Sequence, residues 1–440
     1  MVMKYKEDYI DLHDFFEGER KVKSEGQRYT PKLEGQDLKR YQEYVSFGIL
    51  YNALARTRQG LKGAILRKPV DIQFPENLKP ILDTIMKNGS SIYDVTRDIC
   101  DAVLGYGRIG AMVDIDVKGQ PYISLYDAAN ILDTEMEENK KKIILREIIE
   151  KPEPAELRRH LELINNTFIV TVYQRDDNGE LVKLAPTKNN PNPRIPKYKG
   201  KPLNFIPFTF FGSSSNTPEP SRPPLLDLLN ILKGHWRLTV AYQYGLHFAA
   251  LPTPCFAGFN FEEGQAIALG PGAAHHSPDS AAKSWFLQTG GAGLADIEHG
   301  LDRLEKQMAI VGARLLEGQK ASVEAAETIR LRSSGDTATL SDIAGNIENG
   351  LTKVLQKIGF WLGVPAKNCR VSVNKDFVSA RLTPQEITSL LQAVQAGQMS
   401  EETFIYNLQA GEILQAGRTI EQEIEAINED RKKKTQQGWA

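Results

Sequence analysis

Three glycines, at positions 105, 107 and 110, have the spacing of a dinucleotide-binding fingerprint, G-x-G-x-x-G. That site needs a strand before the glycines and a helix after them, whose free N-terminal amides face a pyrophosphate. Here the order is reversed. Residues 92–104 carry apolar side chains three and four positions apart, which predicts an amphipathic helix, and residues 111–117 alternate apolar and acidic residues, which predicts a half-buried strand. The glycines are therefore predicted to end the helix in a left-handed cap, and a nucleotide-binding enzyme that uses Gly105, Gly107 and Gly110 is kept as an alternative.

Other residues that could do chemistry have simpler interpretations. His275, His276 and Asp279 could suggest a metal, but adjacent histidines point apart on a strand, which favours a surface loop. The acids Asp114 and Asp116 fall on one face of the expected strand, where we expect solvent exposure. We therefore predict no metal site here.

A short polar run, Ser333, Ser334 and Asp336, precedes an expected helix and is interpreted as capping residues. The chain has no G-x-S-x-G, no H-E-x-x-H and no P-loop motif. We predict no catalytic activity and no cofactor.

The bulk composition limits the possible partners. The 440 residues include 54 basic and 56 acidic side chains, a formal net charge of −2. Tight DNA binders usually carry a basic excess, so this balance argues against a tight grip on DNA but not against a conduit through which DNA slides. The first thirty residues are too charged for a signal peptide and no apolar run has membrane-spanning length, so we expect synthesis in a reducing cytoplasm and no membrane partner. The three cysteines, Cys100, Cys255 and Cys369, form no metal-binding or disulfide pattern.

Two stretches have the strongest helical periodicity in the chain. Their apolar residues alternate steps of three and four, which is typical of a narrow seam that packs on a neighbouring helix or subunit. The first seam is Leu294, Ile297, Leu301, Leu304, Met308, Val311 and Leu315, and the second is Leu340, Ala344, Ile347, Leu351, Val354, Ile358 and Trp361.

The order of elements is predicted as follows. A helix covers residues 38–66, and a β-rich region extends from the glycines to about residue 212. A long helix ends before the prolines at 252 and 254, and a compact region of short strands separates it from the next long helix. The sequence TPQE at 383–386 predicts a new helix start, followed by a helical C-terminus and a basic, disordered tail.

This order resembles the portal (head-tail connector) proteins of tailed bacteriophages, and is similar to a portal-like phage family with little biochemical annotation. The residues that carry the resemblance are LGYGRIGAMVDID, GKPLNFIPFTFFG, the block ETIRLRSSGDTATLSDIAGNIENGLTKVLQKIGFWLG and the C-terminal LTPQEITSLLQAVQAGQMSEETF. The resemblance covers residues 40–430.

The resemblance implies an α+β portal fold, with an α/β wing, long stem helices, a small β-containing clip, a tunnel loop and a helical C-terminal crown. The implied boundaries are a wing at 1–223, stem helices at 224–250 and 293–317 around a clip at 251–292, a tunnel loop at 318–336, a wing helix and strand at 337–382, and a crown with a basic tail at 383–440. The ETIRLR segment departs from the family, since it could form a strand within the expected loop.

The implied function is a ring, usually of twelve copies, at one vertex of the virion capsid, through which double-stranded DNA passes during packaging and ejection. The implied partners are further copies of the chain, the terminase large subunit, a head-tail adaptor, and the major capsid and scaffold proteins. Lys320, Arg330 and Arg332 are the residues that we would place near DNA, while a solvated loop with local salt bridges remains an alternative. A structural coiled-coil adaptor without a channel also remains open.

Overall fold

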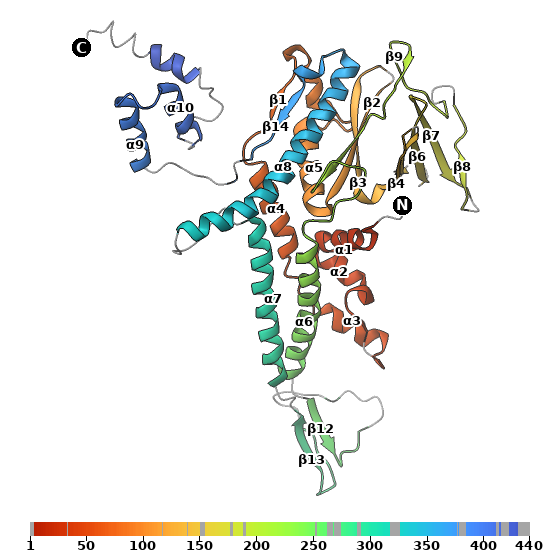
Figure 1. The fold of residues 1–440 in the computed structure, drawn as a ribbon. Helices are drawn as coiled ribbons and strands as arrows, with labels where there is room; N and C mark the ends of the chain where they lie inside the picture. Colours follow the sequence, from red (N-terminus) through yellow and green to blue (C-terminus); the bar gives the residue numbers. More distant parts are fainter. Residues whose placement is uncertain are drawn as a thin grey trace. The chain divides into compact units, whose positions relative to one another are not determined.

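The structure is a computed structural model that describes residues 4–32, 34–116, 118–138, 140–149, 155–176, 179–187, 191–250, 253–261, 267, 274–287, 292–316, 326–375, 377, 384–410, 413–414 and 422–429. The chain divides into two compact units, one of residues 1–317 with 323–374 and one of residues 318–322 with 375–440. Helices and strands are mixed, which confirms the α+β class (Figure 1). None of the described helices is long and apolar enough to cross a bilayer.

The first unit begins with four helices and a short 3-10 turn: α1 (Lys6–Glu17), α2 (Glu19–Ser24), η1 (Gly26–Arg28), α3 (Leu38–Ser46) and α4 (Ala53–Ile65). The single helix that the sequence predicts over 38–66 is therefore wrong, because the chain leaves helical geometry between α3 and α4. Gly48 lies in this break, where an added Cβ would come within 2.4 Å of the ring of Trp236. Asn52 then caps α4 by accepting a hydrogen bond from the Ala55 amide at 3.0 Å.

The reversed fingerprint folds as helix, left-handed cap and strand, as predicted, but Gly107 alone forms the cap, since Gly105 lies inside the helix and Gly110 inside the strand. Ser91 and Asp94 form a capping box at the start of α5 (Ile92–Tyr106), and Gly107 ends the helix with φ +73° and a hydrogen bond from its amide to the Val103 carbonyl. Strand β2 (Arg108–Ile115) follows at once. A Cβ on Gly107 would lie 2.9 Å from two backbone carbonyl oxygens, and one on Gly110 would lie 2.1 Å from the Phe208 ring. Close packing therefore fills the space that a nucleotide would need.

Two antiparallel sheets form the β-rich region. A three-stranded sheet has the order β11-β2-β3, and a five-stranded meander has the order β4-β5-β6-β7-β8. The strands not yet placed are β3 (Pro121–Asp127), β4 (Ile131–Met136), β5 (Lys140–Ile149), β6 (Ala155–Ile164), β7 (Thr167–Arg175), β8 (Leu181–Lys183) and β11 (Phe208–Gly212). Smaller pieces are β1 (Asp71–Gln73) with β14 (Arg370–Ser372), β9 (Lys197–Tyr198) with β10 (Lys201–Pro202), and the 3-10 turns η2 (Glu76–Thr84), η3 (Ala128–Asn130) and η4 (Ala366–Asn368).

The three-stranded sheet is covered on both faces. Along β11, Phe208 and Phe210 enter a core shared with the five-stranded sheet, which includes Leu145, Leu161 and Phe168. The alternate residues turn to the other face, where the ring of Phe211 meets Gly350 of helix α8 (Ala326–Leu362).

Because β2 is the central strand, the expectation that Asp114 is solvent-exposed is wrong. Only 5% of Asp114 is exposed, and its carboxylate forms an ion pair with Arg194. Asp116 lies beyond the end of β2 and its carboxylate accepts hydrogen bonds from the amides of Lys118 and Gln120, which shape the β2–β3 turn. The alternation of apolar and acidic residues along one strand does not reveal whether another part of the chain covers the face that carries the acidic residues.

A polar cluster joins the two sheets. Arg159 of β6 donates to both carboxylate oxygens of Glu147 of β5, at 2.8 and 3.0 Å, and the hydroxyl of Tyr126 of β3 donates to the same carboxylate at 2.5 Å. Burial alone would raise the pKa of Glu147, but these hydrogen bonds outweigh burial and hold the pKa below its usual value.

We expect Glu147→Gln to lower the free energy of unfolding by about 1–2 kcal/mol at pH 7, because it leaves Arg159 partly buried without a counter-ion. A carboxyl with a depressed folded pKa stabilises the fold above its unfolded pKa, near 4.3, and this contribution is lost as the pH falls through the folded value. The wild type should therefore lose stability below about pH 5 more steeply than the variant. Urea unfolding at several pH values measures this; equal slopes for both proteins would contradict it.

Helix α8 starts eleven residues before the helix predicted from position 337, so residues 326–336 are not a loop, and ETIRLR is not a strand. Its first part, ETIRLR, contains good helix formers, and although Ser333, Ser334, Gly335 and Asp336 are weaker ones, no proline interrupts the helix. Ser333, Ser334 and Asp336 lie inside α8, and their interpretation as capping residues is wrong.

The seam of α8 is buried within a single chain. Ile347, Leu351, Val354 and Ile358 are 0% exposed and Leu340 is 7% exposed. The helix packs on β11, β2 and β14. These five residues therefore form no surface for a second copy, and the prediction that they pack between subunits is wrong. The same spacing suits a coiled coil and a helix on a sheet, which the sequence alone does not distinguish.

Helix α8 also carries a half-buried lysine, Lys357. The Lys357 ammonium donates to the hydroxyl of Thr209 at 2.6 Å, and among the described residues no carboxylate forms an ion pair with it. Burial, with the positive charge of Lys353 nearby, lowers the pKa of Lys357 to about 8.

The charged ammonium of Lys357 destabilises the folded state. This destabilisation is complete below about pH 8 and is lost as the pH rises towards the unfolded pKa near 10.4, because the amine loses its proton more readily in the folded protein. We expect Lys357→Met to raise the free energy of unfolding by about 1–3 kcal/mol at pH 7. The free energy of unfolding should then increase less with pH in the variant than in the wild type. Lys367→Met, at an exposed position, is the control. Denaturant melts from pH 7 to 10 test this, and a destabilised Lys357 variant would refute it.

The second unit is helical. Helix α9 (Pro384–Gln395) begins at the proline of TPQE, while Thr383 itself lies outside the described residues. Gly397, with φ +71°, follows the end of α9, and the Ser400 hydroxyl accepts a hydrogen bond from the Thr403 amide at the start of α10 (Glu401–Ala410). Residues 422–429 are also helical, and the expected basic tail at 431–440 lies outside the described residues.

Candidate functional site

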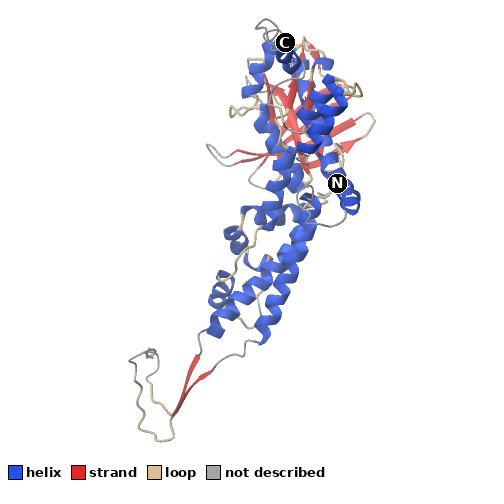
Figure 2. Cartoon of the chain, turned by 90° about the vertical axis from the view of Figure 1, so that its left-hand side faces the viewer, coloured by secondary structure: helices blue, strands red, loops and turns tan. Residues whose placement is uncertain are grey.

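Two long helices and the hairpin between them form the most distinctive part of the first unit (Figures 1 and 2). Helix α6 (Leu226–Ala250) and helix α7 (Ala292–Leu316) begin and end within two residues of the predicted stem helices at 224–250 and 293–317. The hairpin of β12 (Thr253–Ala257) and β13 (Lys283–Leu287) lies in the sequence between them.

The first half of α6 is anchored by the N-terminal segment. Trp236 is fully buried, its indole N–H donates to the hydroxyl of Thr30 at 2.9 Å, and its ring fills the space above Gly48. The ammonium of Lys233 forms an ion pair with Asp11 of α1, and the Arg237 guanidinium donates to the carbonyl of Tyr29 at 3.0 Å. Sequence periodicity did not identify this anchor, because its partners are about 200 residues away.

Helices α6 and α7 pack closely in opposite directions. Gly234, in the first half of α6, faces Leu304, in the middle of α7, whereas Gly245, late in α6, faces Leu294, early in α7. A Cβ on Gly245 would lie 2.7 Å from the Leu294 side chain, so glycine is needed for this approach. The imidazole Nε2 of His235 lies 3.2 Å from the Glu305 carboxylate across the same contact.

The α7 seam thus has its partner in the same chain. Leu301 and Met308 are buried, while Leu294, Ile297, Leu304 and Val311 are half-buried; the side chain of Leu315 lies outside the described residues. Other apolar side chains on the pair stay exposed, with Leu246 37%, Phe248 44% and Ile310 55% accessible.

The hairpin is unusually exposed for its composition. In β13, Trp285, Phe286 and Leu287 are 48%, 67% and 57% accessible. Both strands pair only with each other among the described residues, which leaves one free edge on each. An isolated two-stranded hairpin is marginal in water, and an apolar free edge invites a further strand.

The predicted DNA-facing residues are not brought together in the described structure. Lys320 lies outside the described residues. Arg330 and Arg332 fall in α8, and their side chains are not described. Their contact with DNA stays a prediction.

The histidines and cysteines considered as possible metal ligands or disulfide partners have other surroundings in the structure. The imidazole of His275 packs on the rings of Phe256 and Phe261 in the hairpin region, with centroids 5.3 and 5.9 Å away. Among the described residues no group of three or more histidine, cysteine, aspartate or glutamate side chains could hold a metal. Cys100 and Cys369 are buried free thiols, and Cys255 is half-buried.

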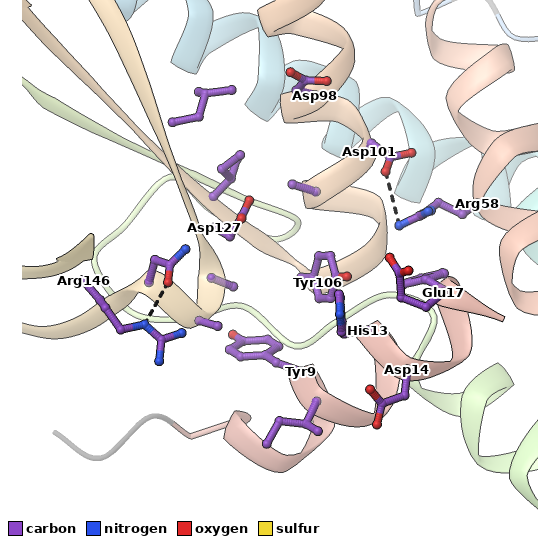
Figure 3. A pocket seen from close by; sticks show the side chains of 18 of the residues that line it. Tyr9, His13, Asp14, Glu17, Arg58, Asp98, Asp101, Tyr106, Asp127 and Arg146 are labelled. Carbon is purple, nitrogen blue, oxygen red and sulfur yellow. Dashed lines mark hydrogen bonds and ion pairs between the residues drawn. The ribbon is translucent and has the colours of Figure 1, made fainter. Parts of the chain in front are cut away.

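A cavity of about 1050 Å³ lies between α1, α5 and the end of β3 (Figure 3). Arg58 and Lys62 both form ion pairs with Asp101 on its wall, at 3.2 and 2.8 Å. The guanidinium of Arg146 lies on another wall and donates through Nε to Asn130 at 3.0 Å. No feature of the sequence pointed to this cavity, since its walls come from eight separate elements.

Comparisons with known proteins give one family match and several remote structural neighbours. A family described as a domain of unknown function (DUF4055) matches residues 224–362, the stretch from α6 to the end of α8. No curated protein matches the chain. The chain is similar to one from the neck of an empty gene transfer agent (GTA) particle computed with C6 symmetry, at 11% identity and a TM-score of 0.43, over 83% of this chain and 92% of that one.

Two further solved structures give comparable values. A chain from the virion of a native GTA particle is 10% identical with a TM-score of 0.42, over 88% of this chain and 98% of that one. A chain from the neck of a native GTA particle computed with C12 symmetry is 10% identical with a TM-score of 0.40, over 80% of this chain and 88% of that one.

Proposed function

We propose that this chain is a portal protein: it forms a closed ring at one vertex of the virion capsid of a tailed phage or a related particle, and DNA passes through the hole. The observation that carries the proposal is the antiparallel pair α6 and α7 with an exposed apolar hairpin between them. A coiled-coil adaptor would leave that insertion without a purpose.

The hairpin supplies a way to close the ring. Its two free edges differ, so the β12 edge of one copy can take the β13 edge of the next in a head-to-tail contact. Such contacts close when the rotation per copy divides the circle. Trp285, Phe286 and Leu287 would be covered in this arrangement.

The partners follow from the same arrangement. The hairpins together form the docking surface for the terminase large subunit during packaging and for a head-tail adaptor afterwards. The first unit contacts the major capsid and scaffold proteins, and the helices of the second unit face the capsid interior. Lys320, Arg330 and Arg332 contact passing DNA through phosphates, without base recognition and without a tight grip.

Sedimentation velocity of the purified full-length protein tests the assembly. We expect one closed oligomer of many copies whose size stops growing as the protein concentration rises, because a ring has no free ends. A monomer at every concentration, or an open-ended series of sizes, would overturn the proposal.

A further inference from the structure

Helix α7 carries two exposed stripes of different charge outside its apolar seam. Residues three and four positions apart share one face of a helix, so the exposed residues fall into two rows whose centres are about 100° apart around the axis. The acidic stripe consists of Ala295, Glu298, Asp302, Glu305 and Ala309, and the basic stripe of Asp296, His299, Arg303, Lys306 and Ile310. Apart from Asp296 at its start, the second stripe carries no acid, and all of these residues are exposed in the single chain.

The charges in these stripes have almost no partners within the chain. Glu298, Asp302, Arg303 and Lys306 form no ion pair or side-chain hydrogen bond with any residue that the structure describes. Asp302 and Lys306 have the i, i+4 spacing of a local ion pair and do not form one. Glu305 has one partner, the imidazole on α6, and 46% of its side chain is exposed. Contacts within one chain therefore leave most of the charge on this surface uncompensated.

We propose that the acidic stripe of α7 in one copy packs against the basic stripe of α7 in the next copy. The inference rests on the proposed ring, in which this is a second contact beside the hairpin. A ring needs two different surfaces that meet at every contact, and stripes of opposite charge on different sides of one helix supply them. A single self-complementary stripe would instead give a two-fold dimer. Opposite charges also disfavour the wrong pairing, because like stripes repel.

The other residues of the stripes suit a contact between helices. Ala295 and Ala309, in the acidic stripe, are small, and the distance between two packed helices depends on the size of the side chains at the contact. Ile310, at the end of the basic stripe, is 55% exposed and would be covered by the neighbour. The apolar seam of α7 is already covered by α6, so the charged stripes are the part of α7 that remains for another copy.

Reversal of each stripe separately tests the contact. One variant combines Glu298→Lys with Asp302→Lys, which makes both stripes net positive, and the other combines Arg303→Glu with Lys306→Glu, which makes both net negative. Each variant alone brings like charges together at every contact and should need about 100-fold more protein to assemble than the wild type. An equal mixture should assemble at the wild-type concentration, because each contact can then join a positive stripe to a negative one. Sedimentation velocity of the full-length proteins measures this.

A control variant carries the same change in net charge at a different place. Lys118 and Lys183 are exposed, on the β2–β3 turn and on β8. Lys118→Glu with Lys183→Glu should assemble as the wild type does. The urea unfolding midpoints of all the variants should match the wild-type midpoint, because the reversed side chains have no partner in their own chain. This comparison separates a lost contact from a lost fold.

The results distinguish this contact from the ring itself. Assembly of either charge-reversed variant alone at the wild-type concentration would overturn the stripe contact and leave the ring, and α7 would then face solvent or DNA on these sides. A mixture that assembles no better than its two components would also overturn the contact. A wild-type protein that never assembles would overturn both proposals.

Discussion

Replacing Trp285, Phe286 and Leu287 together with serine should abolish assembly while leaving the fold intact. These side chains are 48%, 67% and 57% exposed in the single chain, so their loss should change the free energy of unfolding by less than about 0.5 kcal/mol. In the ring they would be buried between copies, where one aromatic anchor contributes 2 kcal/mol or more, about 30-fold in affinity. The triple variant should therefore stay monomeric at concentrations where the wild type is fully assembled.

A matched control is available on another free edge. Leu181 and Val182 of β8 are 38% and 50% exposed apolar residues at the edge of the five-stranded sheet. Their replacement by serine should leave assembly unchanged, because the proposed contact is specific to the hairpin. Size-exclusion chromatography with light scattering reads out both variants, and wild-type assembly by the triple variant would refute the role of the hairpin.

Trp236→Ala should lower the free energy of unfolding by about 3–5 kcal/mol, the usual cost of emptying a fully buried aromatic site. The indole joins α6 to two N-terminal positions, through its hydrogen bond to Thr30 and its contact with Gly48. The collapse of these contacts should also release the segment before α4. Chemical denaturation measures the first effect, and limited proteolysis of that segment measures the second.

Trp285→Ala is the matched control, since the same substitution at an exposed tryptophan should cost less than about 0.5 kcal/mol. Trp236→Phe keeps most of the volume and should recover more than half of the loss. A change below about 1 kcal/mol in Trp236→Ala would mean that the N-terminal segment does not hold α6.

Local signals in the sequence predict much of the fold. The capping box of Ser91 and Asp94 and the left-handed cap at Gly107 are both set by residues a few positions apart. Each is determined by hydrogen bonds or sterics within one or two turns. These are the features that a single sequence encodes most directly.

Tertiary contacts decide the features that the sequence did not predict. The break between α3 and α4 lies where Gly48 meets Trp236, the burial of Asp114 depends on Arg194, and the α8 seam packs on strands more than a hundred residues earlier. The periodicity of α8 correctly indicated a helix with one apolar side. It gave no information on whether that side meets a sheet of the same chain or another copy.

Candidate sites were harder to predict than elements. The cavity between α1 and α5 is lined by residues that range from Lys6 to Ile148, and no single motif contains them. Only a three-dimensional arrangement brings its walls together. Conversely, the glycine fingerprint is a motif without its structural context.

Electron microscopy of the purified full-length protein is the most direct test of the ring. The account predicts end-on class averages that show an annulus of identical copies around a hole wide enough for a DNA duplex, with hairpins of adjacent copies in contact. Isolated globules, or paired helices extending into rods without a hole, would contradict it.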